Sequence, residues 1–516
     1  MTTRRDLLKY ATALAASGGL NASLGSLAFA QATQAKVQLG QAKPFDRESL
    51  VTLAKGLAAK PYEAPQRVPQ EWLDLTYDQY RAIRFDRKAA LWAGSDRPFE
   101  VDFFPPGLYF PTPIAVSIVE DGQQRPVLFD LDVFIKEKIV PKLPLDDPAI
   151  NYSGFRLQGH INDPDRKDEV FVFQGASYFR SLGKGDVYGL SARGLALKTG
   201  DAEGEEFPEF RQFWLEGGLP GDSSVTVHAL LDSPSVAGLY RFVITPGEST
   251  IMDVEARLFP REELAHVGIA AGTSMFLFDE TNRTRFDDFR PAVHDSDGLL
   301  IENGAGETLW RALANPVKLQ VSSFVDDNPR GFGLMQRPRQ FDDYVDLEAL
   351  YHRRPGLWVV PGEDWGKGAV TLVEIPADRE IYDNIVSYWR PRVPLKAGGD
   401  YTYTYRLYWG AQPPLVSNLA RVINTRMGKR WSGRKIVTVD FSDTPQLPEK
   451  LDSVTLHVSS NRGDTSDGIL QRNPSTGGVR LAFDFDPGEA QSVELRAQLV
   501  VGGKPVSEVW LYRWTL

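Results

Sequence analysis

The fold of this 516-residue chain is decided by the stretch Tyr401-Thr402-Tyr403-Thr404-Tyr405-Arg406-Leu407-Tyr408-Trp409-Gly410-Ala411-Gln412-Pro413-Pro414. Its first nine residues alternate so that the odd-numbered side chains, four aromatic and one leucine, share one face. This alternation is the pattern of a half-buried β-strand. The following Gly and Pro residues break the strand and indicate a linker. The sequence therefore predicts a β-sheet protein that divides close to residue 411.

Short alternating runs, cut by Pro and Gly, continue on both sides of this stretch, as expected of strands joined by turns. The clearest are Ile114–Ile118, Val170–Phe173, Val225–His228, Phe242–Ile244, Val370–Pro376, Ile436–Phe441, Val454–Val458, Val479–Phe485 and Val509–Trp514. Helical patterns are few. Residues 46–59 predict an amphipathic helix with Leu50, Leu53 and Leu57 as its apolar stripe, and residues 77–83 predict a second helix. The fold class is therefore all-β.

The length and the break near Pro413 predict two domains, because 516 residues exceed what one hydrophobic core usually supports. We expect a large β-sandwich over residues 31–410, a linker over 411–418, and a small sandwich of immunoglobulin type over 419–516.

Residues 1–30 are interpreted as a targeting segment rather than structure. Thr3-Arg4-Arg5-Asp6-Leu7-Leu8-Lys9 is a twin-arginine pattern, an Ala- and Leu-rich run follows, and Ala28-Phe29-Ala30 is a small-x-small cleavage site. A general secretory signal is the alternative, and either route leads to the periplasm. Other apolar runs are too short to span a bilayer, so we expect no stable membrane insertion.

Composition excludes several classes of function. The net charge is −10 without a basic block, which argues against nucleic acid and anionic membranes as partners. The absence of cysteine excludes thiol catalysis and thiolate metal sites. The six histidines lack the spacing of a helical zinc site. We therefore expect no metal and no cofactor, and a neutral ligand as partner.

Carboxylates, guanidinium groups and indoles recur between Phe289 and Pro391 in short segments bounded by Gly and Pro. This pattern is expected of loops on a β scaffold that line a cleft for a polyhydroxylated ligand. Indole and phenol faces cover sugar C–H surfaces, and arginine donates to hydroxyl groups. The substrate-binding candidates are Tyr178, Arg180, Arg337, Trp365, Tyr382 and Trp389, although each one singly is more often core or turn support.

Cleavage of a glycosidic bond needs two carboxyl groups, one to protonate the leaving oxygen and one to activate the attacking group. Asp295 and Asp297 lie in the turn His294-Asp295-Ser296-Asp297-Gly298, where like charges favour protonation of one of them. Asp383 precedes an apolar, aromatic run. The residues alone do not choose the pair. The turn also resembles part of a calcium loop but lacks the other ligands, Asp383 could be a simple turn residue, and His294 is interpreted as structural.

The chain contains several long motifs in one order: Tyr62–Pro65, Gly175–Arg180, Tyr188–Gly194, Leu231–Pro234, His294–Gly298 and Asp383–Val386. With these motifs it resembles the periplasmic glucan biosynthesis proteins of types G and D, and its twin-arginine segment favours type D. The resemblance implies a large sandwich similar to the galactose-mutarotase supersandwich, followed by an immunoglobulin-like domain, and a role in making osmoregulated periplasmic glucans.

The same resemblance implies an endo-acting enzyme that cleaves β-1,2-glucan with inversion and so controls the glucose backbone. It assigns Asp383 as the general acid and Asp295 as the base. Two alternatives stay open. The connection from Ile423 to Arg434 is short, which favours a transglycosylase over a hydrolase because loop closure controls the entry of water. A non-catalytic glucan-binding or scaffold protein is the other alternative, and a homodimer is a candidate assembly.

Overall fold

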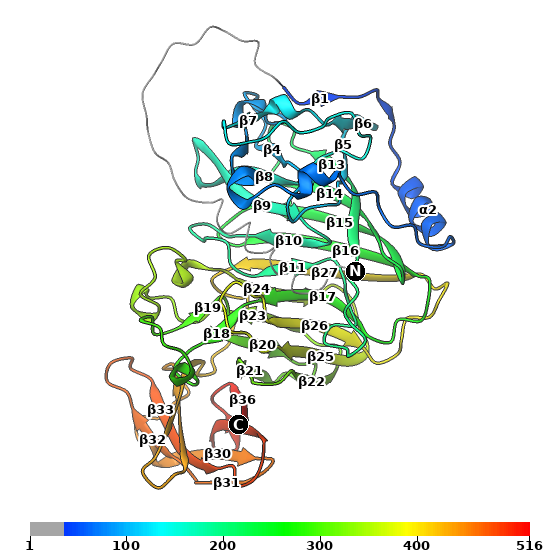
Figure 1. Cartoon of the computed structure of the whole chain (residues 1–516). Coiled ribbons are helices and arrows are strands. Elements are labelled where there is room, and N and C mark those ends of the chain that lie inside the picture. Colours follow the sequence, from blue (N-terminus) through cyan, green and yellow to red (C-terminus); the bar gives the residue numbers. More distant parts are fainter. Residues whose placement is uncertain (1–35) are drawn as a thin grey trace. The chain divides into compact units, whose positions relative to one another are not determined.

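The computed structural model describes residues 36–516, so the targeting segment predicted at 1–30 lies outside the described residues. Strands dominate the described chain (Figure 1), and the predicted all-β fold is confirmed. The chain divides into two compact units. The first comprises the described residues up to Ala271 with Val393–Leu407, and the second comprises Gly272–Arg392 with Tyr408–Leu516. Residues 411–418 form neither helix nor strand, and the division into 31–410 and 419–516 stays a prediction.

One sheet of the first unit is an antiparallel meander with two further strands at its side (Figure 1). The first of these, β5, runs parallel to β13 and pairs in turn with β6. The strands are β5 (Ala115–Glu120), β6 (Gln123–Leu128), β13 (Glu209–Gly217), β14 (Val225–Asp232), β15 (Val236–Thr245) and β16 (Thr250–Pro260).

A second antiparallel sheet in this unit faces the meander through a core of phenylalanine rings. The Phe155 and Phe213 ring centroids lie 5.1 Å apart edge to face, and those of Phe179 and Phe242 lie 5.2 Å apart. Each pair joins one sheet to the other, so the unit is a sandwich. The strands of this sheet that lie before residue 194 are β4 (Phe99–Phe104), β8 (Gly154–Asp163), β9 (Arg166–Gln174), β10 (Tyr178–Ser181) and β11 (Ser191–Arg193), and β11 is followed across the sheet by β17 (Val267–Ser274).

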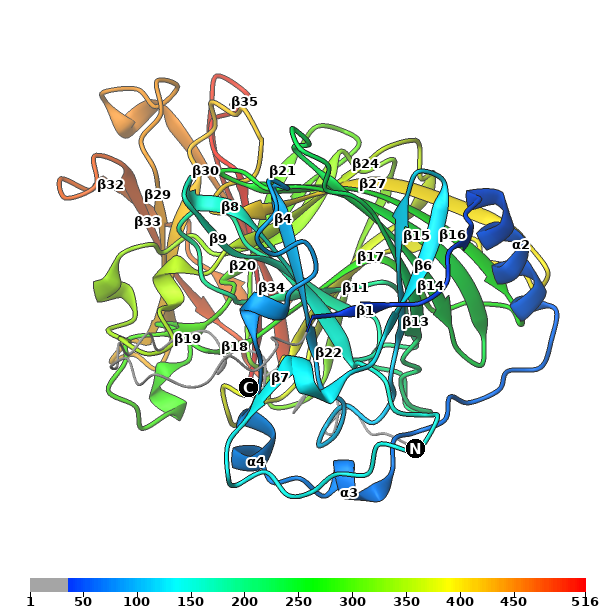
Figure 2. The same cartoon turned by 90° about the horizontal axis from the view of Figure 1, so that it is seen from above.

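Helix α2 (Arg47–Ala58) covers the other face of the meander (Figure 2). Asp46 caps it by accepting hydrogen bonds from the backbone N–H groups of the first turn. The predicted stripe is wrong in one place. Leu53 is 40% exposed, and Val51 and Ala54 are buried instead, because the helix turns an i, i+1, i+4 face toward the sheet. The second predicted helix is shorter than expected and forms α4 (Tyr77–Arg81).

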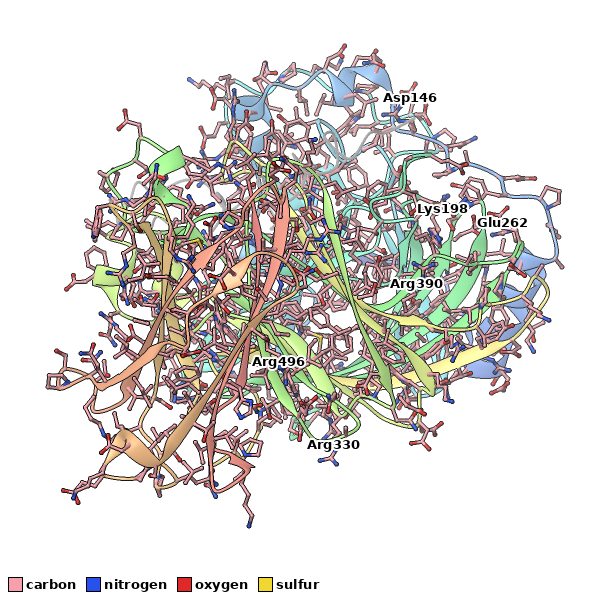
Figure 3. The ribbon with its side chains drawn as sticks, turned by 90° about the horizontal axis from the view of Figure 1, so that it is seen from below. Asp146, Lys198, Glu262, Arg330, Arg390 and Arg496 are labelled. Atoms are coloured by element: carbon pink, nitrogen blue, oxygen red, sulfur yellow. The ribbon has the colours of Figure 1, made fainter. Side chains whose placement is uncertain are left out.

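The motif Leu231–Pro234 spans the last two residues of β14 and the start of the turn after it, and polar contacts hold it in place. The Arg261 guanidinium forms an ion pair with Asp232 (2.9 Å) and donates to the Ser233 carbonyl (2.6 Å). Beyond this loop, Lys198 and Glu262 lie side by side (Figure 3), with 3.6 Å between their charged atoms. The motif is therefore explained by packing of loops at the ends of β14 and β16.

The second unit contains one sheet that runs from residues 298–361 into the C-terminal residues. Its pairings are antiparallel except at its centre, where β21 and β36 run parallel. In order across the sheet the strands are β24 (Gly356–Pro361), β23 (Gly331–Met335), β20 (Gly298–Glu302), β21 (Thr308–Ala312), β36 (Val509–Thr515), β34 (Ser492–Val501) and β30 (Val454–Ser460).

Three C-terminal strands, β28 (Val422–Lys429), β29 (Lys435–Phe441) and β33 (Val479–Asp486), pack against this sheet through a common core. The last hundred residues thus have the two-sheet plan expected of a sandwich. The prediction of a loop between Ile423 and Arg434 is wrong, because most of that segment is strand β28 and only residues 430–434 form a hairpin tip.

Two sets of strands in the second unit position the candidate catalytic residues. Strands β22 (Gln320–Asp327), β25 (Lys367–Glu374) and β26 (Ile385–Pro391) form an antiparallel set. Strands β18 (Phe276–Phe278) and β19 (Val293–His294) form a short antiparallel pair. Over residues 36–516, no helix has the length and apolar character needed to cross a membrane.

Candidate functional site

Both predicted catalytic carboxyl groups lie in the second unit. Asp295 directly follows β19, and Asp383 lies one residue before Asn384, which precedes β26. Their side chains are largely removed from solvent, at 3% and 7% exposure. The fold therefore brings into one unit two buried carboxyl groups that are distant in sequence.

An arginine holds the Asp295 carboxylate. Arg354 Nη1 donates to Asp295 Oδ1, and the Arg354 guanidinium lies over the Tyr351 ring at 4.3 Å from its centroid. The Tyr351 hydroxyl donates to Glu380 (2.9 Å). These contacts fix the direction of the Asp295 carboxylate and compensate its charge. Sequence reasoning missed Arg354, since it lies 59 residues further along the chain and no local pattern marks it.

His294 is a structural residue, as the sequence suggested. Its Nδ1 lies 2.8 Å from Gln336 Oε1, while Gln336 Nε2 donates to the His294 carbonyl (2.8 Å). Its ring stacks on Phe276, with centroids 5.4 Å apart. Burial lowers the pKa of His294 to about 4, so the imidazole stays neutral near pH 7 and does not act as an acid.

Asp297 is a third carboxyl group, beyond the predicted pair. Its Oδ1 accepts a hydrogen bond from the Arg337 backbone N–H (2.8 Å). Burial raises the pKa of Asp297 to about 7. The turn was expected to hold one carboxyl with a raised pKa through like-charge repulsion, but the main cause at Asp297 is desolvation.

The remaining candidates of the second unit lie in different surroundings. Trp389 is fully buried and Trp365 nearly so, and their rings are 6.1 Å apart at the centroids. Tyr382 is half-buried beside Asp383. The Arg337 guanidinium forms two hydrogen bonds of 2.7 Å with Glu508. Their contact with substrate stays a prediction.

Tyr178 and Arg180 lie on β10 in the first unit. Arg180 Nε donates to Ser191 Oγ (2.8 Å), and the Tyr178 ring lies under Arg193, at 5.0 Å from its guanidinium. Strand register aligns Arg180, through Val172, with Arg156 and Asp102 on the face opposite the phenylalanine core.

That aligned row carries a network of charged groups. Arg156 Nε donates to Asp102 Oδ1 (2.5 Å), and Arg156 Nη1 donates to Glu169 (3.0 Å). Burial raises the pKa of Asp102 to about 6. Asp102 and Arg180 are buried, so these donors and acceptors bind mainly to one another and to neighbouring side chains.

Among residues 36–516, His, Asp and Glu side chains form no group of three or more that could hold a metal ion.

Comparison with known proteins defines the class of this all-β protein. Residues 45–514 match the model of the family described as "Periplasmic glucan biosynthesis protein, MdoG", and the chain belongs to this family. It is therefore a periplasmic glucan biosynthesis protein, and the predicted family and location are confirmed.

Relatives give the finer comparison. The chain is 48% identical to glucans biosynthesis protein G of Vibrio cholerae over 490 residues, covering 93% of this chain and 88% of the relative. It is 47% identical to the protein of that name from Shewanella frigidimarina over 494 residues, covering 94% and 87%. Both are named type G, so the preference for type D has no support. A crystal structure of a GH36 α-galactosidase from Geobacillus stearothermophilus is similar at a TM-score of 0.24 and 9% identity, covering 53% of this chain and 34% of that one, too low to carry an argument.

Proposed function

We propose that the chain cleaves β-1,2-glucan internally, with inversion, and thereby controls the glucose backbone of periplasmic glucans. The observation that supports this proposal is the pair of buried carboxyl groups, Asp295 and Asp383, on segments that flank β18. A protein that only bound glucan would have no need of a carboxyl group held in a protonating environment.

We assign the roles that the family resemblance implies. Asp383 acts as general acid and protonates the leaving oxygen. Asp295 acts as base for the incoming hydroxyl, directly or through water, because Arg354 holds its carboxylate in a fixed direction. His294 supplies no proton, since its pKa of about 4 leaves it neutral.

Two other functions compete with this proposal. In a transglycosylase the acceptor at Asp295 is a glucan hydroxyl rather than water. In a scaffold protein the first-unit face around Arg156 and Arg180 binds glucan without cleavage. Product analysis separates the three: shorter chains indicate hydrolysis, a redistribution to longer and shorter chains indicates transfer, and an unchanged distribution at high protein concentration indicates the scaffold.

The test is incubation of purified protein with linear β-1,2-glucan while chain length and product anomer are followed. We expect Asp383→Asn to lower turnover by roughly 10²-fold or more with little change in glucan binding, because it keeps the shape and removes the proton. Asp295→Asn should act likewise, and azide should rescue it with formation of the inverted glucosyl azide.

Asp378→Asn is the matched control, since Asp378 is exposed in the same connection between β25 and β26. The proposal is wrong if Asp383→Asn retains near-normal turnover, or if the first product keeps the anomeric configuration of the substrate.

A further inference from the structure

Strand β18 lies between the two segments that carry the carboxyl groups. On one edge it pairs with β19, with Phe276 opposite His294. The pairing extends one residue further, because the Asp295 backbone N–H donates to the Met275 carbonyl (2.8 Å). One side of β18 therefore fixes the backbone of Asp295.

The other edge of β18 forms hydrogen bonds with the side-chain amide of Asn384. Asn384 Oδ1 accepts from the Phe276 N–H (2.8 Å), and Asn384 Nδ2 donates to the Phe276 carbonyl (2.9 Å). The amide thus satisfies both backbone groups of Phe276, as a neighbouring strand would. Asn384 is only 2% exposed, so water does not replace it readily.

Asn384 is itself fixed to the end of β25. Its Nδ2 also donates to the Ile375 carbonyl (3.0 Å), and its own carbonyl accepts from the Ile375 N–H (2.9 Å). One residue therefore ties β18, β25 and the segment that begins with Asp383.

These contacts form a short path from one carboxyl group to the other. Asp383 is covalently next to Asn384, Asn384 bonds Phe276, and Phe276 lies opposite His294, the neighbour of Asp295. The backbones that carry the two carboxyl groups are therefore coupled through Phe276 and the Asn384 side chain. An inverting pair needs a defined separation of its carboxyl groups, about 6.5–9.5 Å, so a contact that fixes both backbones bears on catalysis.

We infer that Asn384 is a positioning residue that sets the separation of the general acid from the base by holding the free edge of β18. The inference rests on the proposed function. The position of the two carboxyl groups matters, because a displacement of a catalytic group by about 1 Å can lower the rate about 10²-fold.

A second asparagine provides a matched control. Asn315 Nδ2 donates to the Leu277 carbonyl (3.0 Å) and the Ala377 carbonyl (2.8 Å), while its Oδ1 accepts from the Ala377 N–H (3.0 Å). It is 1% exposed. Asn315 thus donates to the carbonyl of the next residue of β18, whereas its oxygen accepts from Ala377, and it borders neither carboxyl group.

The experiment compares Asn384→Ala, Asn384→Asp and Asn315→Ala in the full chain with linear β-1,2-glucan. We expect Asn384→Ala to lower kcat by about 10²-fold while KM changes less than about threefold, because substrate contacts remain. Asn315→Ala should lose similar thermal stability but less than about tenfold in kcat.

The pH dependence of activity in Asn384→Asp tests the positioning role, because a purely structural role would not change it. Its carboxylate can accept from Phe276 N–H but cannot donate to the two carbonyl oxygens, whereas the protonated acid can donate to one of them. The activity of this variant relative to the original protein should therefore rise as the pH falls from about 7 to about 5.

Two outcomes overturn the inference: a folded Asn384→Ala protein with kcat within threefold of the original, or equal losses of kcat for Asn384→Ala and Asn315→Ala. Crystal structures separate this test from the proposed function. We expect the distance between the Asp295 and Asp383 carboxyl groups to change in Asn384→Ala, and an unchanged distance overturns the inference even without turnover. If the original protein leaves glucan uncut but the distance changes in the variant, only the proposed function fails.

Discussion

Arg337 joins two parts of the second unit through its side chain. Its guanidinium makes two hydrogen bonds of 2.7 Å to Glu508 and lies 3.6 Å from the centroid of the Trp310 ring. Arg337→Ala leaves the Glu508 carboxylate buried without its counter-ion. We predict a loss of about 3–5 kcal/mol in the free energy of unfolding, measured by urea denaturation.

Arg330→Ala is the control for Arg337, because Arg330 is 57% exposed and its ion pair with Glu302 is 3.8 Å long. Its loss should cost less than about 1 kcal/mol. Equal stability of the two variants would mean that Glu508 does not need Arg337, and a substrate-binding role for Arg337 would become the better explanation.

Asp297 makes stability depend on pH. Burial raises its folded-state pKa to about 7 from an ordinary 3.8, so the folded state keeps a proton that the unfolded state releases between these values. Stability from this group is complete below about pH 4 and is lost as the pH rises to about 7. We predict that Asp297→Asn unfolds like the original protein at or below about pH 4 and is more stable at pH 8, by on the order of 1–3 kcal/mol.

His294 shifts stability in the opposite direction, but it is present in both proteins of this comparison. Its lowered pKa of about 4 means that stability is lost as the pH falls below about 6.5. The difference between the two urea curves therefore isolates Asp297. Asp287→Asn, at an exposed position of the same unit, controls for the loss of one charge. A difference that is constant with pH would contradict the prediction.

The sequence could identify only part of the candidate site. Motifs marked Asp295 and Asp383 because these residues sit in contiguous, recognisable segments. Arg354 and Asn384 acquire their roles from partners 59 and 108 residues away, and such contacts depend on strand pairing that no local pattern encodes.

At the scale of the elements, three strands of the second unit have a glycine against which a tryptophan ring packs. A Cβ added at Gly298, Gly331 or Gly368 would come closer than 3.0 Å to the ring of a tryptophan on the neighbouring strand. Each glycine is thus required by close approach of the ring. We predict that Gly331→Ala destabilises the protein by about 1–3 kcal/mol in thermal or urea unfolding, because the Trp358 ring must move within a filled core.

Gly56→Ala is the control, and we expect it to stabilise the protein. Gly56 lies inside α2, and a Cβ there would meet no atom within 4 Å. Alanine should therefore raise stability by about 0.5–1 kcal/mol through helix propensity. If both substitutions changed stability equally, the close approach of the indole at Gly331 would not be the cause.

The positions of helices and strands were predicted better than the faces that these elements bury. The alternation over residues 401–409 correctly predicted strand β27 (Tyr401–Gly410), in which Tyr405, Leu407 and Trp409 are buried. The helix over 46–59 was also found, but its buried face was misassigned at Leu53. The period of the apolar residues predicts that a helix forms. Which face of the helix is buried depends on the sheet against which it packs.

At the scale of the molecule, the core joins segments far apart in sequence. The break near Pro413 was visible as Gly and Pro residues, but the parallel pairing of β21 with β36 was not, because about two hundred residues separate the two strands. Residues 419–516 share one hydrophobic core with β20, β21, β23 and β24. The C-terminal sandwich is consequently continuous with the sheet before it.

Because of this shared core, we expect the two fragments to stay associated after proteolytic cleavage of the linker. Residues 411–418 are mostly exposed and form neither helix nor strand, so a protease should cleave there first. We predict that the fragments, about 380 and 100 residues long, separate on a denaturing gel but elute together in size-exclusion chromatography, because separation would expose Trp310, Trp358 and Trp510. Addition of urea should release them together with a shift in tryptophan fluorescence. Elution of a folded 100-residue fragment by itself under native conditions would contradict the prediction and would favour two independent domains.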